Sequence, residues 1–546
     1  MSLRKYRSWV IVGATVVVHL FVAARSVGPM YVFDEIGYLA GGNVIAGHGA
    51  DWALCGSSYS VGYSVVLAPL WWLPVSPIAI YQIAVFLSAA LGALAIWPAT
   101  LLARRFGASA GVALVIGALV TLIPARALMS NYVLAENPLT LLVLCAVLLA
   151  LKVADRARRF DVVLLGATAG LASVVHARAL PLVMVTVMWI LVRAILKKTR
   201  WLDAVAGAAL ALGLAIGGVV AQTAMGAHIF TDDSRVGNLV GHLSLSNIVE
   251  VLMGQAFTQV VSWSLLTVLG VLAVASKARA AWRKHGPQSV ATAWWWLGGM
   301  FVAQASFFVW VLASSADFAT RFDIPIFGRY LDPFAVPVAV LGAVTLWVGA
   351  RKRIVTVALV ISAIFVATYC AAVLPRISPE AKWIPFAIPG LNPFLTVHDS
   401  PFDYRPAMLI AGIVALAGCV LLWAFKGRAK QSIVVALAAA ALMTVGADAL
   451  RVDPLEGDSR STSVTSEAVI ANPGRAVTLA ADLLPCLEAN KIQYELAGTV
   501  RIVPTGGDYG TDLVVGPKTW PDATSLGLSK VLLTTWLEAA LWTGQQ

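Results

Sequence analysis

Long apolar runs recur along almost the whole chain and are separated by shorter polar segments. An α-helix rises ~1.5 Å per residue, so a run of about 20 residues matches the ~30 Å hydrocarbon thickness of a bilayer. The pattern therefore predicts an α-helical polytopic membrane protein with thirteen transmembrane helices. Their expected positions are residues 8–28, 77–103, 108–124, 138–154, 161–176, 180–196, 203–224, 257–276, 290–313, 332–350, 354–374, 405–425 and 431–448.

The first apolar run follows a short basic stretch, an arrangement that a cleaved secretion signal also shows. Here the run extends from Trp9 to about Gly28, and no small-residue cleavage site leads from it into a soluble domain. We therefore interpret this run as the first transmembrane helix, which enters the membrane from the cytoplasm.

One apolar segment within the polar loop 29–76 is too short to span a bilayer. It extends from Val61 to Trp72 and is rich in Trp and Tyr. These side chains favour the membrane–water interface, so the segment predicts a helix that lies in the plane of the interface.

The composition changes at about residue 449, after which Asp, Ser, Gly and Pro become more frequent. Alternating segments such as 494–503 are typical of strands. The final apolar stretch, 526–542, is interpreted as an amphipathic or packing helix. We therefore expect a helical transmembrane domain over residues 1–448 and a small soluble α/β domain over residues 449–546.

The overall composition excludes a soluble protein. Of the 546 residues, 59% are hydrophobic and only 12% are charged, and the mean hydropathy is +0.83. A soluble protein carries roughly a quarter charged residues, because they cover most of its surface. So few charges can cover the surface only if much of that surface faces lipid.

The net charge of +11 could indicate nucleic-acid binding, but the positions of the basic residues suggest another cause. Most fall in short clusters between apolar runs, and all of these clusters lie on one side of the membrane if the spans are drawn as above. Such a bias marks the cytoplasmic face. The clusters are Arg4, Lys5 and Arg7; Arg104 and Arg105; Lys152, Arg156, Arg158 and Arg159; Lys197, Lys198 and Arg200; Lys277, Arg279, Arg283 and Lys284; Arg351, Lys352 and Arg353; and Lys426, Arg428 and Lys430.

This sidedness predicts a multi-pass protein of the plasma (inner) membrane with a cytoplasmic N-terminus. An odd number of spans places the C-terminal domain on the extracytoplasmic side. The longer polar segments lie on that side too, and they are the candidates for chemistry: residues 29–76, 225–256, 314–331 and 375–404.

Two adjacent acids, Asp34 and Glu35, directly follow the first span. An isolated pair of acids in a loop is more simply explained as solvated. Here the pair is flanked by aromatic residues, including Tyr38, and precedes the interfacial segment. A carboxyl group near the lipid boundary is partly desolvated, which raises its pKa and suits it to proton abstraction.

Four arginines recur at the extracytoplasmic ends of spans: Arg126, Arg178, Arg321 and Arg329. Singly, each is more simply a snorkelling or helix-end residue. Together with carboxylates, they form what a phosphate-bearing lipid requires, because guanidinium groups bind phosphate bidentately and stabilise it as a leaving group. Glu136 opens the fourth span, where the helix dipole alone would favour an acid. His176 ends the fifth span and is more simply explained as a hydrogen-bonded polar residue at a span end than as a metal ligand.

These motifs, in this order, resemble the GT-C superfamily of membrane glycosyltransferases. The resemblance rests on Asp-Glu-x-x-Tyr after the first span (Asp34, Glu35, Tyr38), on a Met-Ser-x5-Glu-Asn-Pro stretch ending at Pro138, on His-x-Arg-x-x-Pro from His176, and on Gly-Arg-Tyr-Leu-x-Pro (Gly328–Pro333). It covers about residues 1–350 and is strongest to the protein O-mannosyltransferase and lipid A aminoarabinose transferase branch.

The resemblance implies an inverting glycosyltransferase that takes a sugar from a polyprenyl-phosphate donor. Asp34 is the position of the catalytic base, and Glu35 matches the second acid, which is expected to bind acceptor, sugar or a divalent metal. Arg329 would contact the donor phosphate, with Arg126, Arg178 and Arg321 as further phosphate-binding candidates. Tyr38, Glu136, His176 and Tyr330 are assigned to the cavity without fixed roles.

The membrane topology independently favours a lipid donor. A sugar nucleotide would bind on the cytoplasmic side, where the sequence shows no domain and no Gly-rich phosphate loop. The acceptor remains open between a cell-envelope glycan, a lipid-linked glycan and a protein. Usage rich in Ala, Val, Gly and Arg is typical of a high-GC bacterium, which favours a role in cell-wall biogenesis.

The alternatives are a transporter or flippase of lipid-linked saccharides, a polymerase or ligase of such saccharides, and a non-catalytic scaffold. A transporter is expected to carry ionisable residues near the bilayer midplane, whereas here they gather at the outer ends. Of the five cysteines, Cys55 and Cys486 both lie on the predicted extracytoplasmic side, where a disulfide between them could persist; free thiols are the alternative.

Overall fold

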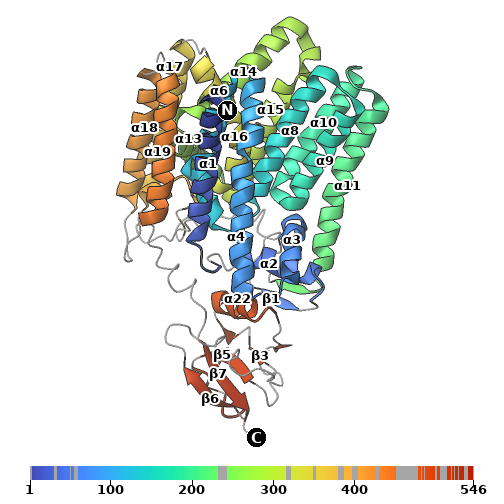
Figure 1. The fold of residues 1–546 in the computed structure, drawn as a ribbon, viewed down its shortest axis with the longest axis vertical. Coiled ribbons are helices and arrows are strands. Elements are labelled where there is room, and N and C mark those ends of the chain that lie inside the picture. Colours follow the sequence, from blue (N-terminus) through green and yellow to red (C-terminus); the bar gives the residue numbers. More distant parts are fainter. Residues whose placement is uncertain are drawn as a thin grey trace.

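The structure is a computed structural model. It describes residues 3–29, 33–48, 51–54, 59–231, 243–314, 321, 323–348, 352–378, 387–395, 404–424, 429–450, 477–480, 483–484, 486–498, 501–503, 513–517, 519–521, 523–526, 528–533 and 539–544. A large helical bundle lies above a small region of strands, and the last long helix of the bundle, α19, lies beside α1 (Figure 1).

Long helices form the bundle. They are α1 (Leu3–Ala24), α4 (Pro77–Leu94), α5 (Ile96–Arg105), α6 (Ala110–Leu122), α8 (Glu136–Arg156), α9 (Arg159–Val175), α10 (Leu180–Ile195), α11 (Trp201–Met225), α13 (Leu245–Trp263), α14 (Leu265–His285), α15 (Ala293–Ser314), α16 (Asp332–Val348), α17 (Lys352–Thr368), α18 (Arg405–Ala424) and α19 (Ala429–Leu450).

Shorter helices connect or cap them. They are α2 (Asp34–Ile45), α3 (Val61–Leu67), η1 (Ala68–Trp72), α7 (Pro124–Ala127), η2 (Leu128–Asn131), η3 (Ala177–Ala179), η4 (Gly286–Ala291), η5 (Gly328–Tyr330), η6 (Tyr369–Val373), η7 (Leu374–Arg376), η9 (Asn392–Phe394) and α22 (Cys486–Glu495). The apolar segment expected in the interface plane is helical, as α3 and η1.

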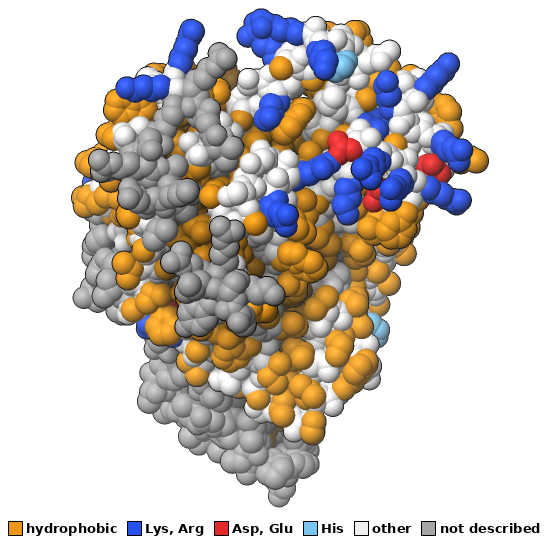
Figure 2. Space-filling view, turned by 45° about the horizontal axis from the view of Figure 1, so that its top comes forward, with side chains coloured by type: hydrophobic (Ala, Val, Ile, Leu, Met, Phe, Trp, Pro, Cys, Tyr) orange, Lys and Arg blue, Asp and Glu red, His pale blue; other side chains and the backbone are white. Residues whose placement is uncertain are grey.

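The chain is a multi-pass membrane protein. Among the described residues, eight helices are long and apolar enough to cross a membrane, and a ninth span results if α6 and the helix bent away from it at Pro124 are taken together. Shorter apolar helices occupy three further expected spans, at Ser8–Ala24, Asp332–Trp347 and Val435–Ala449. Lys and Arg side chains gather at the end of the bundle that holds the N-terminus (Figure 2).

One expected span, residues 257–276, is wrong as a single helix. Ser264 has a φ of +50°, which interrupts the helical hydrogen bonds and divides the segment between α13 and α14. Because α13 begins at Leu245, the polar segment 225–256 also contains part of a helix that the sequence did not predict. Both halves of 257–276 are apolar, so hydropathy alone predicts one continuous helix over this segment.

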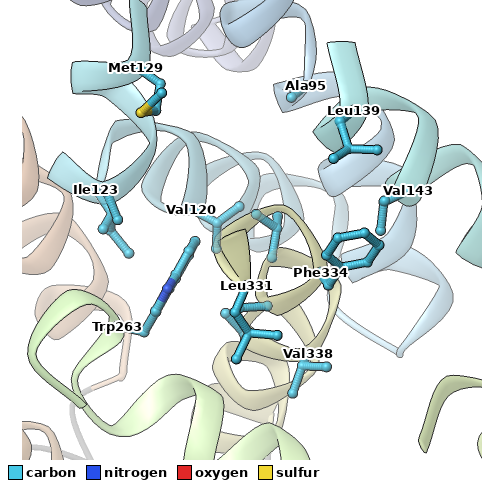
Figure 3. Packing of buried hydrophobic residues seen from close by; sticks show 14 of the residues in the cluster. Ala95, Val120, Ile123, Met129, Leu139, Val143, Trp263, Leu331, Phe334 and Val338 are labelled. Atoms are coloured by element: carbon cyan, nitrogen blue, oxygen red, sulfur yellow. The ribbon is translucent and has the colours of Figure 1, made fainter. Parts of the chain in front are cut away.

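Packing around the start of α16 fixes the position of the preceding turn, η5, along the bundle. Leu331, Phe334 and Val338 lie in one packed cluster with side chains from α6, α8 and α13 (Figure 3). Those partners include Val120, Leu139, Val143 and Trp263. Asp332, the first residue of α16, accepts a hydrogen bond from the Trp263 indole at 3.0 Å. Short η5 is thereby held against the bundle.

The C-terminal strands form one mixed sheet in the order β4-β3-β5-β7-β6. They are β3 (Val477–Leu479), β4 (Arg501–Ile502), β5 (Leu513–Pro517), β6 (Leu528–Leu533) and β7 (Ala539–Gly544). The two pairings among β4, β3 and β5 are parallel, whereas β7 pairs antiparallel with both β5 and β6.

Two local expectations for this region are wrong. The stretch 526–542 contributes strands β6 and β7 instead of a helix, and the alternating residues Ala540 and Trp542 are buried in the small core of the sheet. The segment 494–503 is a strand only at Arg501 and Ile502, because Tyr494 and Glu495 end α22.

A second, two-stranded sheet joins distant loops of the bundle. Strand β1 (Trp52–Leu54) pairs parallel with β2 (Ile229–Thr231), which follows α11. Helix α22 of the C-terminal region lies directly on β1, where Gln493 exchanges hydrogen bonds with both backbone groups of Ala53 at 2.8 and 2.7 Å. The first loop is thus held from two sides.

Candidate active site

Asp34 is the first residue of α2, at the edge of the bundle opposite the basic clusters. An acid in the first turn of a helix is stabilised by the helix dipole. One carboxylate oxygen of Asp34 accepts a hydrogen bond from the Tyr59 hydroxyl at 2.7 Å. The other oxygen accepts one from the Arg329 guanidinium, also at 2.7 Å.

Arg329 lies in η5, 295 residues further along the chain, and bridges two acids. Its Nη2 pairs with Asp34, and its Nε lies 2.9 Å from Oε1 of Glu136. Glu136 opens α8, where its charge also faces the positive end of the helix dipole. The ion pairs therefore tie together the starts of α2 and α8 and the turn before α16.

Arg178 completes this group of charges from η3. Its Nη1 lies 3.5 Å from Oε1 of Glu136, and its guanidinium stacks over the Tyr330 ring at 3.3 Å from the centroid. We refer to Asp34, Glu136, Arg178 and Arg329 as the charged cluster. It holds two acids and two cations and is therefore electrically balanced.

The members of the charged cluster differ in how far a substrate can reach them. The side chains of Arg329 and Glu136 are only 2% and 4% exposed, whereas those of Asp34 and Arg178 are 15% and 18% exposed. Asp34 is therefore the carboxylate that an incoming molecule can contact, and Arg178 is the more accessible cation.

The surroundings favour the ionised form of Asp34. Burial alone would raise the pKa of the Asp34 carboxyl, but the Arg329 cation and the hydrogen bond from Tyr59 hold that pKa below its ordinary value. Burial works against the charge of Arg329 as well, yet Glu136 and Asp34 raise the pKa of the guanidinium above its ordinary value. The pair is therefore charged at neutral pH.

A group of tyrosines lies next to the charged cluster. The Tyr38 ring packs against Tyr59 and Tyr63, with centroids 5.2 and 5.4 Å apart. Burial, reinforced by the charge of Glu136, raises the pKa of the Tyr38 hydroxyl far above its ordinary value, so Tyr38 stays protonated. These rings form an apolar wall beside Asp34.

Glu35 lies apart from Asp34 although the two are adjacent in sequence. Its side chain is fully buried, and its Oε1 accepts hydrogen bonds from the Tyr81 hydroxyl at 2.9 Å and from the Val133 N–H at 2.7 Å. These contacts connect α2 with α4 and with the segment before α8. They favour a role for Glu35 in positioning α2.

The other predicted site residues lie around the charged cluster or outside it. Arg126 donates to the backbone oxygen of Glu136 at 3.2 Å and to the side chain of Asn137 at 3.0 Å, so it supports the start of α8. The His176 ring accepts a hydrogen bond from the Arg178 N–H at 3.3 Å and caps η3. Arg321 instead forms a two-point ion pair with Asp323, at 3.0 and 2.6 Å.

Cys55 and the side chain of Cys486, the predicted disulfide partners, lie outside the described residues. Within the described part of the chain, no three His, Cys, Asp or Glu side chains group together as ligands for a metal ion.

Sequence analysis missed Tyr59. No spacing pattern connects it with Asp34, because a helix and a strand lie between them. Its place is set by Gly37, since a Cβ added at that glycine would lie 2.1 Å from a Tyr59 ring carbon. A glycine one helical turn after a candidate acid is too common to serve as a signal.

Comparison with known proteins defines the fold. No protein-family model and no curated protein matches the chain. Solved structures share the polytopic helical fold of the chain. The chain is similar to ArnT from Cupriavidus metallidurans, with a TM-score of 0.57 for the structure bound to undecaprenyl phosphate and 0.54 for the apo structure. Both comparisons cover 100% of each chain at 16% identity.

A more distant likeness is to the arabinosyltransferase EmbB from Mycobacterium smegmatis, with a TM-score of 0.44 at 15% identity over 98% of this chain and 46% of that one.

Proposed function

We propose that this protein is an inverting glycosyltransferase that moves a sugar from a polyprenyl-phosphate donor to a hydroxyl group of an extracytoplasmic acceptor. The observation that carries the proposal is the charged cluster, in which an accessible, ionised Asp34 lies beside two arginines at one end of a membrane bundle. The fold shared with ArnT bound to undecaprenyl phosphate supports a lipid phosphate as the partner of those arginines.

The proposed reaction is a single displacement at the anomeric carbon. The acceptor hydroxyl transfers its proton to a carboxylate oxygen of Asp34, and its oxygen forms a bond to the anomeric carbon. The bond from that carbon to the phosphate oxygen breaks, and the electron pair leaves with the phosphate. Arg329 and Arg178 stabilise the charge that develops on the leaving phosphate. One displacement inverts the configuration.

The ion pair between Asp34 and Arg329 imposes a condition on this reaction. A carboxylate that shares its charge with a guanidinium is a poor base. A donor phosphate bound at the more exposed Arg178 would add negative charge next to Arg329 and Asp34, which weakens this ion pair and makes Asp34 more basic, while Tyr59 still holds the other carboxylate oxygen. The donor is therefore expected to bind before the acceptor proton is removed.

The proposal leaves the sugar and the acceptor open. A cell-envelope glycan, a lipid-linked glycan and a protein all present the hydroxyl group that Asp34 would deprotonate. The apolar wall formed by Tyr38, Tyr59 and Tyr63 suits the face of a sugar ring, because aromatic side chains provide large, rigid contact surfaces.

Transfer of radiolabelled sugar from a panel of polyprenyl-phosphate donors by purified protein tests the function. Asp34→Asn is expected to lower turnover by about 10²- to 10⁴-fold, which is the usual contribution of a general base, while donor binding persists. Glu250→Gln is the matched control, because Glu250 forms an ion pair with Arg376 outside the charged cluster. Its turnover is expected to match that of the wild type.

The product distinguishes the mechanism from its rivals. Inversion at the anomeric carbon, read by NMR, supports direct displacement. Wild-type protein that binds donors but turns over none of them, across envelope acceptors, would instead support a transporter or scaffold. Equal turnover in Asp34→Asn and wild type would remove Asp34 as the base.

A further inference from the structure

A large cavity lies at the opposite end of the bundle from the charged cluster. Its volume is about 770 Å³, and it is enclosed by the ends of α5, α8 and α10 and by η4 and the start of α15. Helix α8 begins at Glu136 and reaches this cavity 20 residues later at Arg156. At ~1.5 Å per residue, the two sites are on the order of 30 Å apart.

Positive charge dominates the lining of this cavity, which we call the basic pocket. Four cations and one acid line it, together with one histidine: Arg105, Arg156, Arg193, Lys198, Asp155 and His285. The single acid, Asp155, forms an ion pair with Arg105. Three cations therefore lack a counter-charge within the lining. Figure 2 shows Lys and Arg side chains gathered at this end of the bundle, with few acids among them.

Arg193 shows that this excess of charge is built into the protein interior. Arg193 is 3% exposed, and its guanidinium donates to the backbone oxygens of Val153 and Ala291 and to the Thr199 hydroxyl. Carbonyl groups satisfy hydrogen bonds but do not cancel a charge. Among the described residues, no carboxylate forms an ion pair with Arg193. A buried cation of this kind is costly unless an anion compensates it.

The remaining basic side chains differ from Arg193 in being exposed. Arg156 lines the pocket from the end of α8 and Lys198 from the turn after α10, and both are exposed. Their hydrogen-bond donors are thus available to an incoming anion. Guanidinium and ammonium groups arranged in this way match the oxygens of a phosphate group.

The walls of the basic pocket also contain apolar surface. Phe106, Leu151, Ala154 and Trp294 line it, and the Phe106 and Trp294 rings pack with centroids 5.8 Å apart. The basic side chains of the pocket suit the charged head group of a lipid, and its apolar side chains suit the first part of the acyl chains. The pocket lies at the ends of membrane helices, where both parts of a lipid are found. Basic pockets between membrane helices bind phosphorylated head groups by this combination.

We propose that the basic pocket binds a phosphate-type anion, the head group of an anionic phospholipid in the leaflet at this end of the bundle. Arg156 and Lys198 contact the phosphate, and the buried Arg193 supplies a fixed positive charge beneath it. The site is separate from the charged cluster and does not depend on the proposed transfer reaction. Its occupant joins the ends of α8, α10 and α15, so binding stabilises the bundle.

The test uses the purified full-length chain in nanodiscs of phosphatidylcholine with and without phosphatidylglycerol. The thermal unfolding midpoint and the lipids retained in native mass spectrometry are measured. Phosphatidylglycerol is expected to raise the midpoint and to be retained by the wild type. The double variant Arg156→Gln/Lys198→Gln is expected to bind it at least about tenfold more weakly, since each cation near a membrane surface contributes to binding.

The matched control is Arg283→Gln/Lys284→Gln. It removes two exposed cations from the same end of the bundle but outside the lining, so its response to phosphatidylglycerol is expected to equal that of the wild type. If inorganic phosphate in detergent reproduces the stabilisation, and the pocket variant abolishes it, the anion is a free phosphate instead of a lipid. Equal responses of the wild type and the pocket variant, or equal losses in pocket and control variants, would overturn the proposal.

Discussion

Arg329 contacts both acids of the charged cluster, and this contact makes their burial possible. A carboxylate such as Glu136, at 4% exposure, is stable inside the protein only if a cation compensates it. Arg329 provides that charge and at the same time faces Asp34. Loss of a single member would leave the charged cluster with one uncompensated charge, so the four residues are expected to depend on one another for stability.

The hydrogen bond from Tyr59 to Asp34 predicts a change in the pH profile. A hydrogen bond to the ionised form lowers the pKa of a carboxyl group, so Tyr59→Phe is expected to raise the pKa of Asp34. As the proposed base, Asp34 acts only when it is ionised. Activity is therefore lost as pH falls through this pKa, and the acid limb of kcat/KM moves to higher pH in Tyr59→Phe.

Tyr369→Phe is the control for this profile, because Tyr369 stacks on Phe257 away from Asp34, with centroids 4.1 Å apart. Its acid limb is expected to coincide with that of the wild type. An unchanged acid limb in Tyr59→Phe would mean that Asp34 is not the group whose ionisation controls the rate.

At the residue scale, the sequence predicts which charged residues lie together better than it predicts which of them pair with one another. Asp34, Glu136, Arg178 and Arg329 were all candidates, and the structure brings them together. Charge and position alone do not separate Arg329 from Arg321, since both lie in one polar segment, and only the Gly-Arg-Tyr motif of the family resemblance favoured Arg329. The structure separates the two arginines by a local contact, because the Arg321 guanidinium forms an ion pair with Asp323, two residues away.

At the element scale, α2 presents Asp34 because two of its faces are fixed. Glu35 anchors one face to Tyr81 and to the Val133 backbone. Gly37 permits close approach of the Tyr59 ring on another. These two contacts orient α2 so that its first residue, Asp34, faces Arg329. Small changes of side chain along α2 should therefore shift the position of Asp34.

Gly37→Ala is expected to disturb the site without touching a charged residue. The added Cβ would lie 2.1 Å from Tyr59, so the ring must move and its hydroxyl leaves Asp34. Misplacement of a positioning group by ~1 Å can reduce turnover by up to about a hundredfold. Turnover of Gly13→Ala is the comparison, because an added Cβ at Gly13 has no neighbour within 4 Å.

Retention of full activity by Gly37→Ala would show that Tyr59 does not need its observed position. A similar loss in Gly13→Ala would instead indicate a general effect of added side-chain volume on the bundle.

Hydropathy predicted most helices, because apolar length is what a bilayer selects. Hydropathy gave the wrong element where the backbone conformation, and not the apolar length, determines the secondary structure. The positive φ of Ser264 divides a continuous apolar segment, and nothing in its composition marks the break. Near the C-terminus, the stretch 526–542 is apolar on average, but its residues pair as two antiparallel strands, which short-range pattern alone does not distinguish from a helix.

At the scale of the whole molecule, the C-terminal region and the first loop form a continuous contact. Besides the bonds of Gln493 to Ala53, the Tyr494 hydroxyl donates to the backbone oxygen of Pro77 at 2.5 Å, and its ring packs edge-on against Trp71. Helix α22 therefore packs against the loop that carries Asp34.

Gln493→Ala is expected to loosen this contact. Loss of both hydrogen bonds leaves the Ala53 backbone unpaired, at a cost of about 1–3 kcal/mol. Amide hydrogen exchange, followed by mass spectrometry, should accelerate in β1 and α22 while α8 is unaffected. Ser529→Ala, within the C-terminal sheet, should leave exchange in β1 unchanged. Wild-type exchange in Gln493→Ala would show that other contacts hold α22.

In the proposed reaction, Arg329 would face both the base Asp34 and the leaving phosphate, and this has a consequence for the energy of the transfer. As Asp34 takes up a proton it loses one negative charge, and the departing phosphate gains one. Both changes occur beside the same guanidinium, so the total charge around Arg329 is conserved from reactants to products. Creating or removing a net charge in a buried site costs much free energy. In this reaction the net charge of the site stays constant, and a negative charge only moves the short distance from Asp34 to the phosphate.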